Sequence, residues 1–518
     1  MKSATSEYAV IRGARLLNAG MPAATGAGIA AAMRGAPFAD VLIKGDTIAE
    51  VGAPGVAAPA GATVIDASNR LLIPGLINAH THSHGNIPRS LGDRWTLELA
   101  LNANSAIRSN QSSADKYLGA QLGAAEMIRK GCTACYDLVY EFPEPTLEGL
   151  NALGQAYTDA GMRAVVAPLM STRSFYAAIP GLMDALPEDV RADFSKPQRI
   201  SPGERSLAIM RQALHEWQYD RSRVKLAVAP HSPLHSSDEF LIGTQKLARE
   251  FEVGLHTHLA ESKVQAVGGM NHYGRTLTAH LADLGVLGPN FTAAHGLWLD
   301  DDEMKLLADV GASIAHNPAS NMRYGNGLAA VRRMIDCGVN VGLGTDSRSC
   351  SDNLNMFEAM KLASFTSRVQ TPDYTRWLTT DEALGMATVN SAKLLGFGDD
   401  LGLIAAGYKA DIVFLDLENL NYIPLNSAIN QVVNAEDATG VDSVMIAGRM
   451  VLDHGRLTTI DVARLKRDAE AAMERLWQVN GKALELALRL EDVVGTFCVG
   501  MAQSPYHVHR YVEPLPAR

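Results

Sequence analysis

The sequence has few of the features that mark secreted, membrane or nucleic-acid-binding proteins. Its 518 residues include five cysteines, a small odd number that argues against a disulfide framework and favours reduced thiols in the cytoplasm. No stretch of about 18 apolar residues occurs, so no membrane span is expected, and the N-terminal MKSATSEYAV lacks the apolar core of a secretory signal. Lys and Arg total 46 against 56 Asp and Glu, without a basic run, so nucleic acid is not an expected partner.

The sequence does contain ample core material in a regular alternation. Apolar residues make up 47% of the chain, which excludes wholesale disorder. Across residues 71–400, short apolar runs alternate with helix-like segments, which predicts a (β/α)8 TIM barrel of the α/β class. The eight runs expected to form its strands are Leu72–Ala79, Ala134–Leu138, Arg163–Leu169, Val224–Ala229, Gly254–His258, Thr292–His295, Ser313–His316 and Val339–Gly344.

The segments on either side of this barrel have β character. Residues 1–70 are predicted to form strands and turns, with a loop or insertion over 19–37, and strand-like runs return over 401–458. We expect these two parts to share one small β-sandwich domain built from both ends of the chain. The remainder, 459–518, is predicted to be a helix over 460–490 followed by a tail.

Pairs of histidines at the ends of two predicted strands are the strongest chemical signal. His80 and His82 lie two residues apart, and strand side chains repeat every two residues, so both imidazoles share a face. His256 and His258 repeat the arrangement, with Glu261 on the outgoing loop. We expect His258 to be a metal ligand, His256 to be a satisfied core residue, and Glu261 to face a metal-bound water.

Two further polar residues end predicted strands. His295 ends one short apolar run, and Asp346 follows the run 341–344, although Asp at such a position can also be an ordinary helix N-cap. Strand ends meet at the C-terminal rim of a barrel, so these side chains and the histidine pairs should converge there. Three imidazoles and one carboxylate suit zinc or iron(II). The expected ligands are His80, His82, His258 and Asp346.

These motifs resemble those of the amidohydrolase superfamily, in the branch that contains chlorotriazine hydrolases and adenosine-type and guanine-type deaminases. The resemblance covers nearly the whole chain, including the flanking β domain, and its motifs are specific in combination. They are PGLINAHTH at 74–82, HTHLAES at 256–262, AHGLWLDDDE at 294–303, AHNPASNM at 315–322, GTDS at 344–347, DNLNMFEAMK at 352–361 and GYKADIVFLD at 407–416.

The resemblance implies roles for the site residues. The three histidine ligands would hold one divalent metal, and Asp346 would be both the fourth ligand and a base for the bound water. Glu261 would carry a proton to the leaving group, and His295 would polarise the substrate or steady the developing charge. Some relatives hold two metals bridged by a modified lysine at the end of the fourth strand. Here Lys225 lies at the start of that strand, so we expect one ion, zinc, with iron as the alternative.

Substrate contacts are expected on the loops that follow the strands, because those loops build barrel active sites. The segment after the first histidine pair lacks the Glu-Trp pair that the resemblance associates with nucleoside deaminases, which argues against an adenosine-type substrate. His84 could extend the ligand row or line the pocket. The candidate substrate-binding residues are His84, Trp95, Arg173, Tyr176, His231, Asn321 and Ser347.

The function expected from these residues is hydrolysis of a C–N bond in a small cyclic or aromatic nitrogen compound, of the deaminase type. Hydrolysis of an amide, urea or carbamate, or of a ring-carbon halide, would use the same nucleophile and remains an alternative. A non-catalytic metal-binding barrel is an alternative of another class. The partner is expected to be a small molecule, and the protein is expected to be a homo-oligomer.

Overall fold

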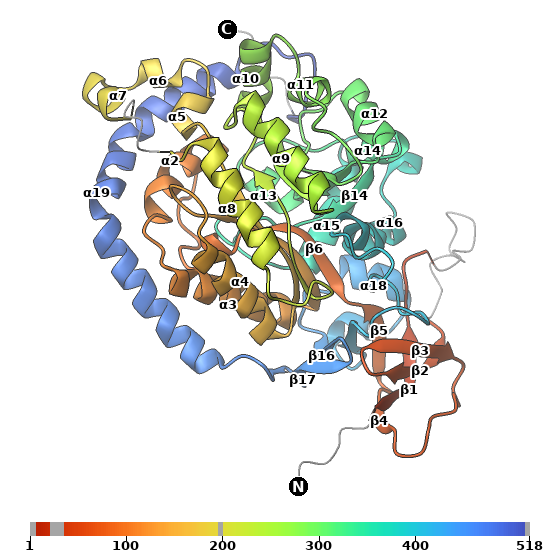
Figure 1. Ribbon diagram of the computed structural model, residues 1–518. Coiled ribbons are helices and arrows are strands. Elements are labelled where there is room, and N and C mark those ends of the chain that lie inside the picture. The colour runs from red at the N-terminus through yellow and green to blue at the C-terminus, as the bar shows by residue number, and fades with distance from the viewer. Residues whose placement is uncertain (1–6, 21–35, 195–199, 513–518) are drawn as a thin grey trace.

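The structure is a computed structural model that describes residues 7–20, 36–194 and 200–512 (Figure 1). Its centre is a ring of parallel strands whose side chains are almost all buried, as expected for strands covered on both faces. The fourth position of the ring is shared by two short strands. The ring consists of β6 (Leu76–Thr81), β7 (Cys132–Tyr140), β8 (Arg163–Met170), β9 (Val224–Leu226) with β10 (Ala229–Pro230), β11 (Leu255–Leu259), β12 (Phe291–His295), β13 (Ser313–His316) and β14 (Asn340–Leu343).

Two backbone connections close this ring. The sheet β10-β8-β7-β6 meets the sheet β11-β12-β13-β14 through a parallel bridge between Val228 and Leu255. On the other side, the backbone N–H of Asp346 donates to the carbonyl oxygen of His80 at 2.9 Å, which joins the segment after β14 to β6. The predicted (β/α)8 barrel is therefore confirmed.

Helices surround the barrel and cover the outer face of its strands (Figure 1). Most begin with a Ser, Thr, Asp or Asn whose side chain accepts a backbone N–H of the first turn, which satisfies donors that a helix start leaves unpaired. The longer helices are α2 (Leu97–Ile107), α3 (Ser113–Arg129), α4 (Leu147–Ala160), α8 (Gly203–Glu216), α9 (Asp238–Glu250), α10 (Lys263–Tyr273), α12 (Asp301–Asp309), α15 (Met356–Arg368) and α16 (Thr380–Ala387). The shorter ones are η1 (Ser83–Gly85), α5 (Phe175–Ala178), α6 (Leu182–Ala185), α7 (Glu188–Phe194), α11 (Leu277–Asp283), α13 (Pro318–Arg323), α14 (Val331–Asp336), η3 (Tyr374–Arg376), α17 (Val389–Leu394), η4 (Leu420–Tyr422) and α18 (Ala428–Asn434).

A second domain is built from both ends of the chain, as predicted. Its nine strands form one sheet in the order β18-β17-β16-β15-β5-β1-β2-β3, with β4 beside β1. The insertion predicted over 19–37 falls mostly on residues 21–35, which lie outside the described residues. The strands are β1 (Tyr8–Leu16), β2 (Phe38–Lys44), β3 (Thr47–Gly52), β4 (Thr63–Asp66), β5 (Arg70–Pro74), β15 (Ile412–Asp416), β16 (Val441–Ile446), β17 (Arg449–Asp453) and β18 (Arg456–Leu457).

The strand predicted over Leu72–Ala79 is wrong, because the chain changes sheets within it. Residues up to Pro74 form β5, which pairs with β1 and β15 in the β domain, whereas β6 of the barrel starts at Leu76. Gly75 lies between them, and a Cβ there would come within 2.1 Å of the Thr133 side chain. The apolar run is continuous because both strands are buried, so hydrophobicity alone does not reveal the break.

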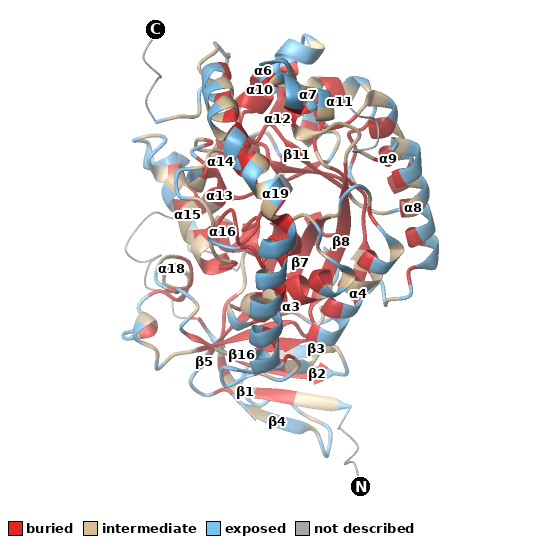
Figure 2. Cartoon of the chain, turned by 90° about the vertical axis from the view of Figure 1, so that its left-hand side faces the viewer, coloured by how far each residue is buried: buried red, intermediate tan, exposed pale blue. Residues whose placement is uncertain are grey.

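The chain ends in a helix that is longer than predicted. The sequence predicts a helix over 460–490 and then a tail, but α19 runs from Val462 to Ala502. Its last turns bury Leu490, Val494 and Cys498 in one cluster with the helices after β8, which stabilises the extension. The helix runs from the β domain along the flank of the barrel, with an exposed outer face (Figures 1 and 2). No helix in the described part of the chain has the length and apolar character that crossing a membrane requires.

Candidate functional site

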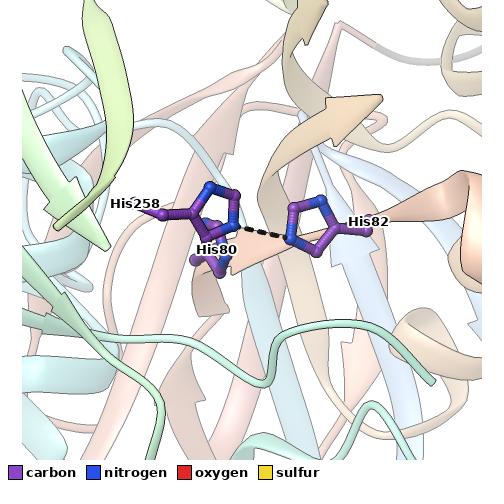
Figure 3. A group of neighbouring side chains, drawn as sticks. All are labelled: His80, His82 and His258. Atoms are coloured by element: carbon purple, nitrogen blue, oxygen red, sulfur yellow. Dashed lines mark hydrogen bonds between the residues drawn. The ribbon is translucent and has the colours of Figure 1, made fainter. Parts of the chain in front are cut away.

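Four candidate ligands gather at the C-terminal ends of the barrel strands. His80 and His82 come from β6, His258 from β11, and Asp346 from the segment after β14. His82 Nε2 lies 3.3 Å from His258 Nε2 (Figure 3) and 3.3 Å from Asp346 Oδ1. His80 Nε2 lies 3.9 Å from the same carboxylate oxygen. The structure therefore brings together all four residues that the sequence singles out as ligands.

Hydrogen bonds fix the orientation of these side chains. The Nδ1 atoms of His82 and His258 face backbone carbonyl oxygens at 2.6 and 2.8 Å, so they carry the proton and leave Nε2 with a free lone pair. The Asp346 carboxylate accepts the backbone N–H of Ser347 at 2.6 Å and the hydroxyl of Ser320 at 2.7 Å. Each donor holds one carboxylate oxygen, so the carboxylate is oriented as firmly as the rings.

The donor set fits a divalent ion such as zinc. Neighbouring ligand atoms around a tetrahedral ion with bonds of about 2.0–2.3 Å lie roughly 3.3–3.8 Å apart, and the closest pairs here are 3.3 Å apart. Both ring nitrogens of His80 are buried without a hydrogen-bond partner, which is unfavourable for polar atoms that bind nothing. Two lone pairs that face each other, as in His82 and His258, also favour a cation between them.

The electrostatics of the site keep these ligands free of protons. Burial lowers the pKa of His82 and of His258 to about 4, so both rings are neutral at neutral pH. Burial would raise the pKa of Asp346, but the facing rings of His82 and His295 and the Ser320 hydroxyl hold it below its ordinary value. The cluster thus presents neutral imidazoles and one carboxylate anion, the protonation states that metal binding requires.

Glu261 and His295 lie beside the four ligands. The Glu261 carboxylate comes within 3.6 Å of His295 Nε2, and that nitrogen is 3.9 Å from Asp346 Oδ2. His295 Nδ1 pairs with the amide oxygen of Asn321 at 2.9 Å, which turns Nε2 toward the two carboxylates. Burial, together with the nearby carboxylates of Asp346 and Glu98, raises the pKa of Glu261 well above its ordinary value. Glu261 therefore holds a proton under conditions in which Asp346 does not.

A cavity of about 330 Å³ opens onto these residues. Its inner end is lined by His82, His258, Glu261 and Asp346. Its outer walls are mostly apolar and come from α2, from the segment around α5 to α7, and from α19. A partly open, largely apolar cavity with a small number of polar groups is typical of small-molecule sites.

Four of the seven candidate substrate-binding residues line this cavity and three do not. The four are His84, Arg173, Tyr176 and His231. Trp95 packs against Gly92 and against a cluster whose other members, Leu97 among them, line the cavity, but Trp95 itself is not one of the lining residues. Asn321 and Ser347 are occupied in holding His295 and Asp346 respectively, so they act on the reacting groups and not on a pocket surface.

The sequence analysis missed several residues of the cavity wall. Arg108 at the end of α2, Asn104 one turn before it and Phe194 of α7 all line the cavity. From α19, so do Leu486 and Ala487. None follows a barrel strand directly, so the strand-end signal could not find them. His256, expected to be a satisfied core residue, is fully buried edge-on against Tyr136, but neither of its ring nitrogens has a hydrogen-bond partner among the described residues, so the prediction that it is satisfied is wrong.

The fold and the site together define a metal-dependent hydrolase with a (β/α)8 barrel. The profile of the amidohydrolase family matches residues 71–451, and the chain belongs to that family. A 5'-deoxyadenosine deaminase of Methanothermobacter thermautotrophicus is 34% identical over 441 residues, or 84% of this chain and 94% of that protein. A 5-methylthioadenosine/S-adenosylhomocysteine deaminase of Syntrophomonas wolfei is 31% identical, over 80% of this chain and 88% of that protein.

Solved structures are similar over most of the chain. An adenosine deaminase of Xanthomonas campestris with bound zinc is 25% identical, with a TM-score of 0.77, over 90% of this chain and 98% of that chain. The zinc complex of an atrazine chlorohydrolase from Arthrobacter aurescens has the same fold, with 24% identity, a TM-score of 0.77, and coverage of 90% and 99%. The predicted resemblance, the fold and the assignment as a C–N hydrolase are thus confirmed.

Proposed function

We propose that this protein removes an exocyclic amino group from an aromatic nitrogen heterocycle by hydrolysis. The observation that carries the proposal is the arrangement at the inner end of the cavity. An oriented carboxylate, Asp346, lies beside three neutral imidazoles, and the raised pKa of a second carboxyl group, Glu261, leaves it protonated within the same enclosed space. A base and an acid with separated pKa values are what a hydrolysis that expels an amine needs.

We infer that His80, His82, His258 and Asp346 hold one ion, zinc in the first instance, with iron(II) as the alternative. When bound, such an ion lowers the pKa of a coordinated water toward neutrality and so supplies a nucleophile at neutral pH. A single ion is supported by the position of Lys225. Its ammonium group donates to the Gly396 carbonyl at 2.5 Å and lies 3.7 Å from the Phe397 ring centre, at the opposite end of the barrel.

Asp346 and Glu261 carry out separate proton transfers. Asp346 accepts a proton from the attacking water, since its lowered pKa keeps it ionised beforehand. Glu261 delivers its proton to the departing nitrogen, because an amide ion is too basic to leave unprotonated. His295 Nε2 lies within 3.9 Å of both carboxylates. Because Nδ1 donates to Asn321, Nε2 of the neutral ring is an acceptor, and His295 steadies developing negative charge once that nitrogen has taken up a proton.

Three of the similar proteins named above are named as deaminases of adenosine-type compounds, and the fourth is an atrazine chlorohydrolase, so the pocket itself has to indicate the substrate class. Among its described lining residues the only carboxylates are Glu261 and Asp346, both at the inner end. The outer walls combine apolar residues such as Leu97, Phe142 and Leu486 with polar side chains, among them Asn104, Ser109 and Ser171, that can meet sugar hydroxyls. We therefore propose an aminoheterocycle, either as the free base or with a substituent that reaches the outer walls, as the substrate class.

The test is release of ammonia or amine by the zinc-loaded protein from a panel of aminopurines, aminopyrimidines, aminotriazines and adenosine-type nucleosides. Aryl ureas, carbamates, anilides and chlorotriazines belong in the same panel, because they distinguish the alternative hydrolases on this scaffold. Turnover of a ring amine with about one zinc per chain is the expected result. Turnover of ureas or amides alone would move the function to that alternative, and a metal-loaded but inert protein would favour a non-catalytic barrel.

We also propose that the protein works in the cytoplasm as a homo-oligomer. The five cysteines are all free thiols and four are buried, in keeping with a reducing compartment. Exposed apolar side chains recur along the outer face of α19, including Trp477, Val479 and Leu488, which suits an interface between copies. Light scattering of the purified protein tests the second point, and a monomeric mass would contradict it.

A further inference from the structure

Arg108 is a guanidinium group in the cavity wall that lacks acceptors for most of its N–H groups. It ends α2, lines the cavity, and has no carboxylate of the described residues within ion-pair distance. One nitrogen, Nη2, donates to the hydroxyl of Ser349. Its Nε is buried without any partner. A buried or half-buried donor without an acceptor is costly, and the cost is greatest for a charged group.

The contact between Arg108 and His84 does not provide an acceptor for the Arg108 N–H groups. Arg108 Nη1 lies 3.1 Å from His84 Nε2, a distance that suits a hydrogen bond only if Nε2 accepts. His84 Nδ1, however, accepts the backbone N–H of Tyr140 at 3.2 Å. A neutral imidazole has one acceptor and one donor nitrogen, so Nε2 carries the proton and both groups are donors.

We propose that Arg108 and His84 form a two-donor cradle for an oxygen atom of the substrate. Two donor nitrogens 3.1 Å apart can share one oxygen acceptor, as adjacent N–H groups do in other anion and carbonyl sites. The cradle opens into the same cavity as Glu261 and His82. The substrate would be an aminoheterocycle that carries a ring carbonyl or a carboxylate, with that oxygen between the two side chains and the amino group toward Glu261.

Two hydrogen bonds to α19 hold the end of α2, and with it Arg108, in place. Asn102 of α2 donates to the carbonyl oxygen of Ala487 in α19 at 2.8 Å. Asn480 of α19 donates to the carbonyl oxygen of Ser109, the residue after Arg108, at 3.0 Å. The end of α2 is thus fixed to the terminal helix, which keeps the guanidinium group at one position in the cavity wall.

The inference rests on the proposed function, and its test uses substrate pairs in which one member carries a ring carbonyl or carboxylate that the other member lacks. Adenine is compared with isoguanine, melamine with ammeline, and an aminopyrimidine with its carboxylate derivative, each on the zinc-loaded full chain. The variants are Arg108→Met, Arg108→Lys and, as a matched control, Arg464→Met, whose side chain is 75% exposed on α19. Zinc content and thermal stability are measured for each variant, so a folding defect is recognised.

Wild-type protein should prefer the oxygen-bearing member of a pair. Arg108→Met should lower kcat/KM for that member by about 10- to 100-fold, the loss expected for a charged hydrogen bond, and change the oxygen-free member little. Arg108→Lys should recover part of the loss for a carboxylate and less for a carbonyl, which distinguishes the two oxygen sources. Equal losses on both members, or no preference in the wild type, would overturn the cradle.

A binding measurement separates this inference from the proposed function. Calorimetric titration of zinc-loaded Glu261→Gln protein with ammeline and with melamine needs no turnover. Tighter binding of ammeline that disappears in the double variant Glu261→Gln/Arg108→Met supports the cradle even if no ring amine is hydrolysed. Equal binding of both compounds would reject it even if deamination is observed.

Discussion

Replacement of Glu261 by glutamine tests the proposed proton delivery most directly. Glutamine has nearly the same shape and keeps a carbonyl oxygen toward His295, but it cannot supply a proton at the atom that lies 3.6 Å from His295 Nε2. The four proposed ligands are untouched, so bound zinc should stay at the wild-type level. The experiment therefore changes one acidic proton and little else.

The expected loss follows from what the proton does. General acid catalysis contributes about 10²- to 10⁴-fold to a rate, so kcat should fall by that factor, which corresponds to roughly 3–5.5 kcal/mol of activation free energy. The raised pKa of Glu261 predicts that the high-pH limb of the kcat profile, where the acid loses its proton, disappears in the variant. A leaving group such as chloride departs without a proton, so a chlorotriazine should show a much smaller loss than an aminotriazine.

The assay is steady-state kinetics from pH 5 to pH 10 on zinc-quantified protein, with Glu303→Gln as the matched control. Glu303 is also a buried glutamate, but it caps α12 away from the cavity, and glutamine serves equally well in a capping box. Wild-type turnover of a ring amine by Glu261→Gln would refute the assigned role. Equal losses for chloride and amine leaving groups would also refute it, because the defect would then lie in nucleophilic attack.

Three further outcomes follow from the same structure. Elemental analysis of His258→Ala should show zinc reduced about tenfold or more, whereas Lys225→Met should retain one ion, and a lower content in Lys225→Met would indicate a second site. Burial lowers the pKa of His316 to about 3, so the unfolded chain binds more protons below about pH 6.5, and stability should fall as the pH drops from 6.5 toward 3. The slope of about 1.4 kcal/mol per pH unit from this histidine should be absent in urea denaturation of metal-free His316→Gln. Asp411→Ala should lower the free energy of unfolding by about 3–5 kcal/mol, because it leaves Arg163 buried and unpaired, and Arg163→Met/Asp411→Leu should recover most of that loss in the same assay.

The barrel and the gathering of the strand-end residues could be predicted because each depends on local sequence. Strands buried on both faces appear as continuous apolar runs, and the first polar side chains after them reach the same rim. His80, His258 and Asp346 are such residues, so their convergence follows from topology without knowledge of distances. The break between β5 and β6 leaves no such trace, since both sides of Gly75 are equally apolar.

The residues of the cavity wall could not be predicted for a different reason. Arg108 ends a helix, where an arginine is ordinarily solvated and interacts with the free carbonyls. Leu486 and Ala487 belong to a helix almost four hundred residues further along the chain, and only the packing of α19 on α2 brings them to the cavity. Trp95 shows the converse error, because it follows the first strand in the sequence and packs against cavity-lining residues such as Leu97 but does not line the cavity itself.

Metal chemistry and substrate choice depend on different parts of this chain. The reacting groups sit on the ends of barrel strands or directly after them, where the ring of hydrogen bonds fixes the geometry, so a substitution there alters metal binding and chemistry together. Part of the outer wall comes from α19, which begins at Val462, beyond the 71–451 matched by the family profile. The helix α19 affects the cavity directly, through Ala487 in its wall, and indirectly, through the hydrogen bond from Asn102 of α2 to the Ala487 carbonyl oxygen. Neither residue is a proposed ligand. Substitutions on the inner face of α19 should therefore change KM and the ranking of substrates while leaving zinc content unaltered, which Leu486→Ala and Leu486→Phe would reveal on the same substrate panel.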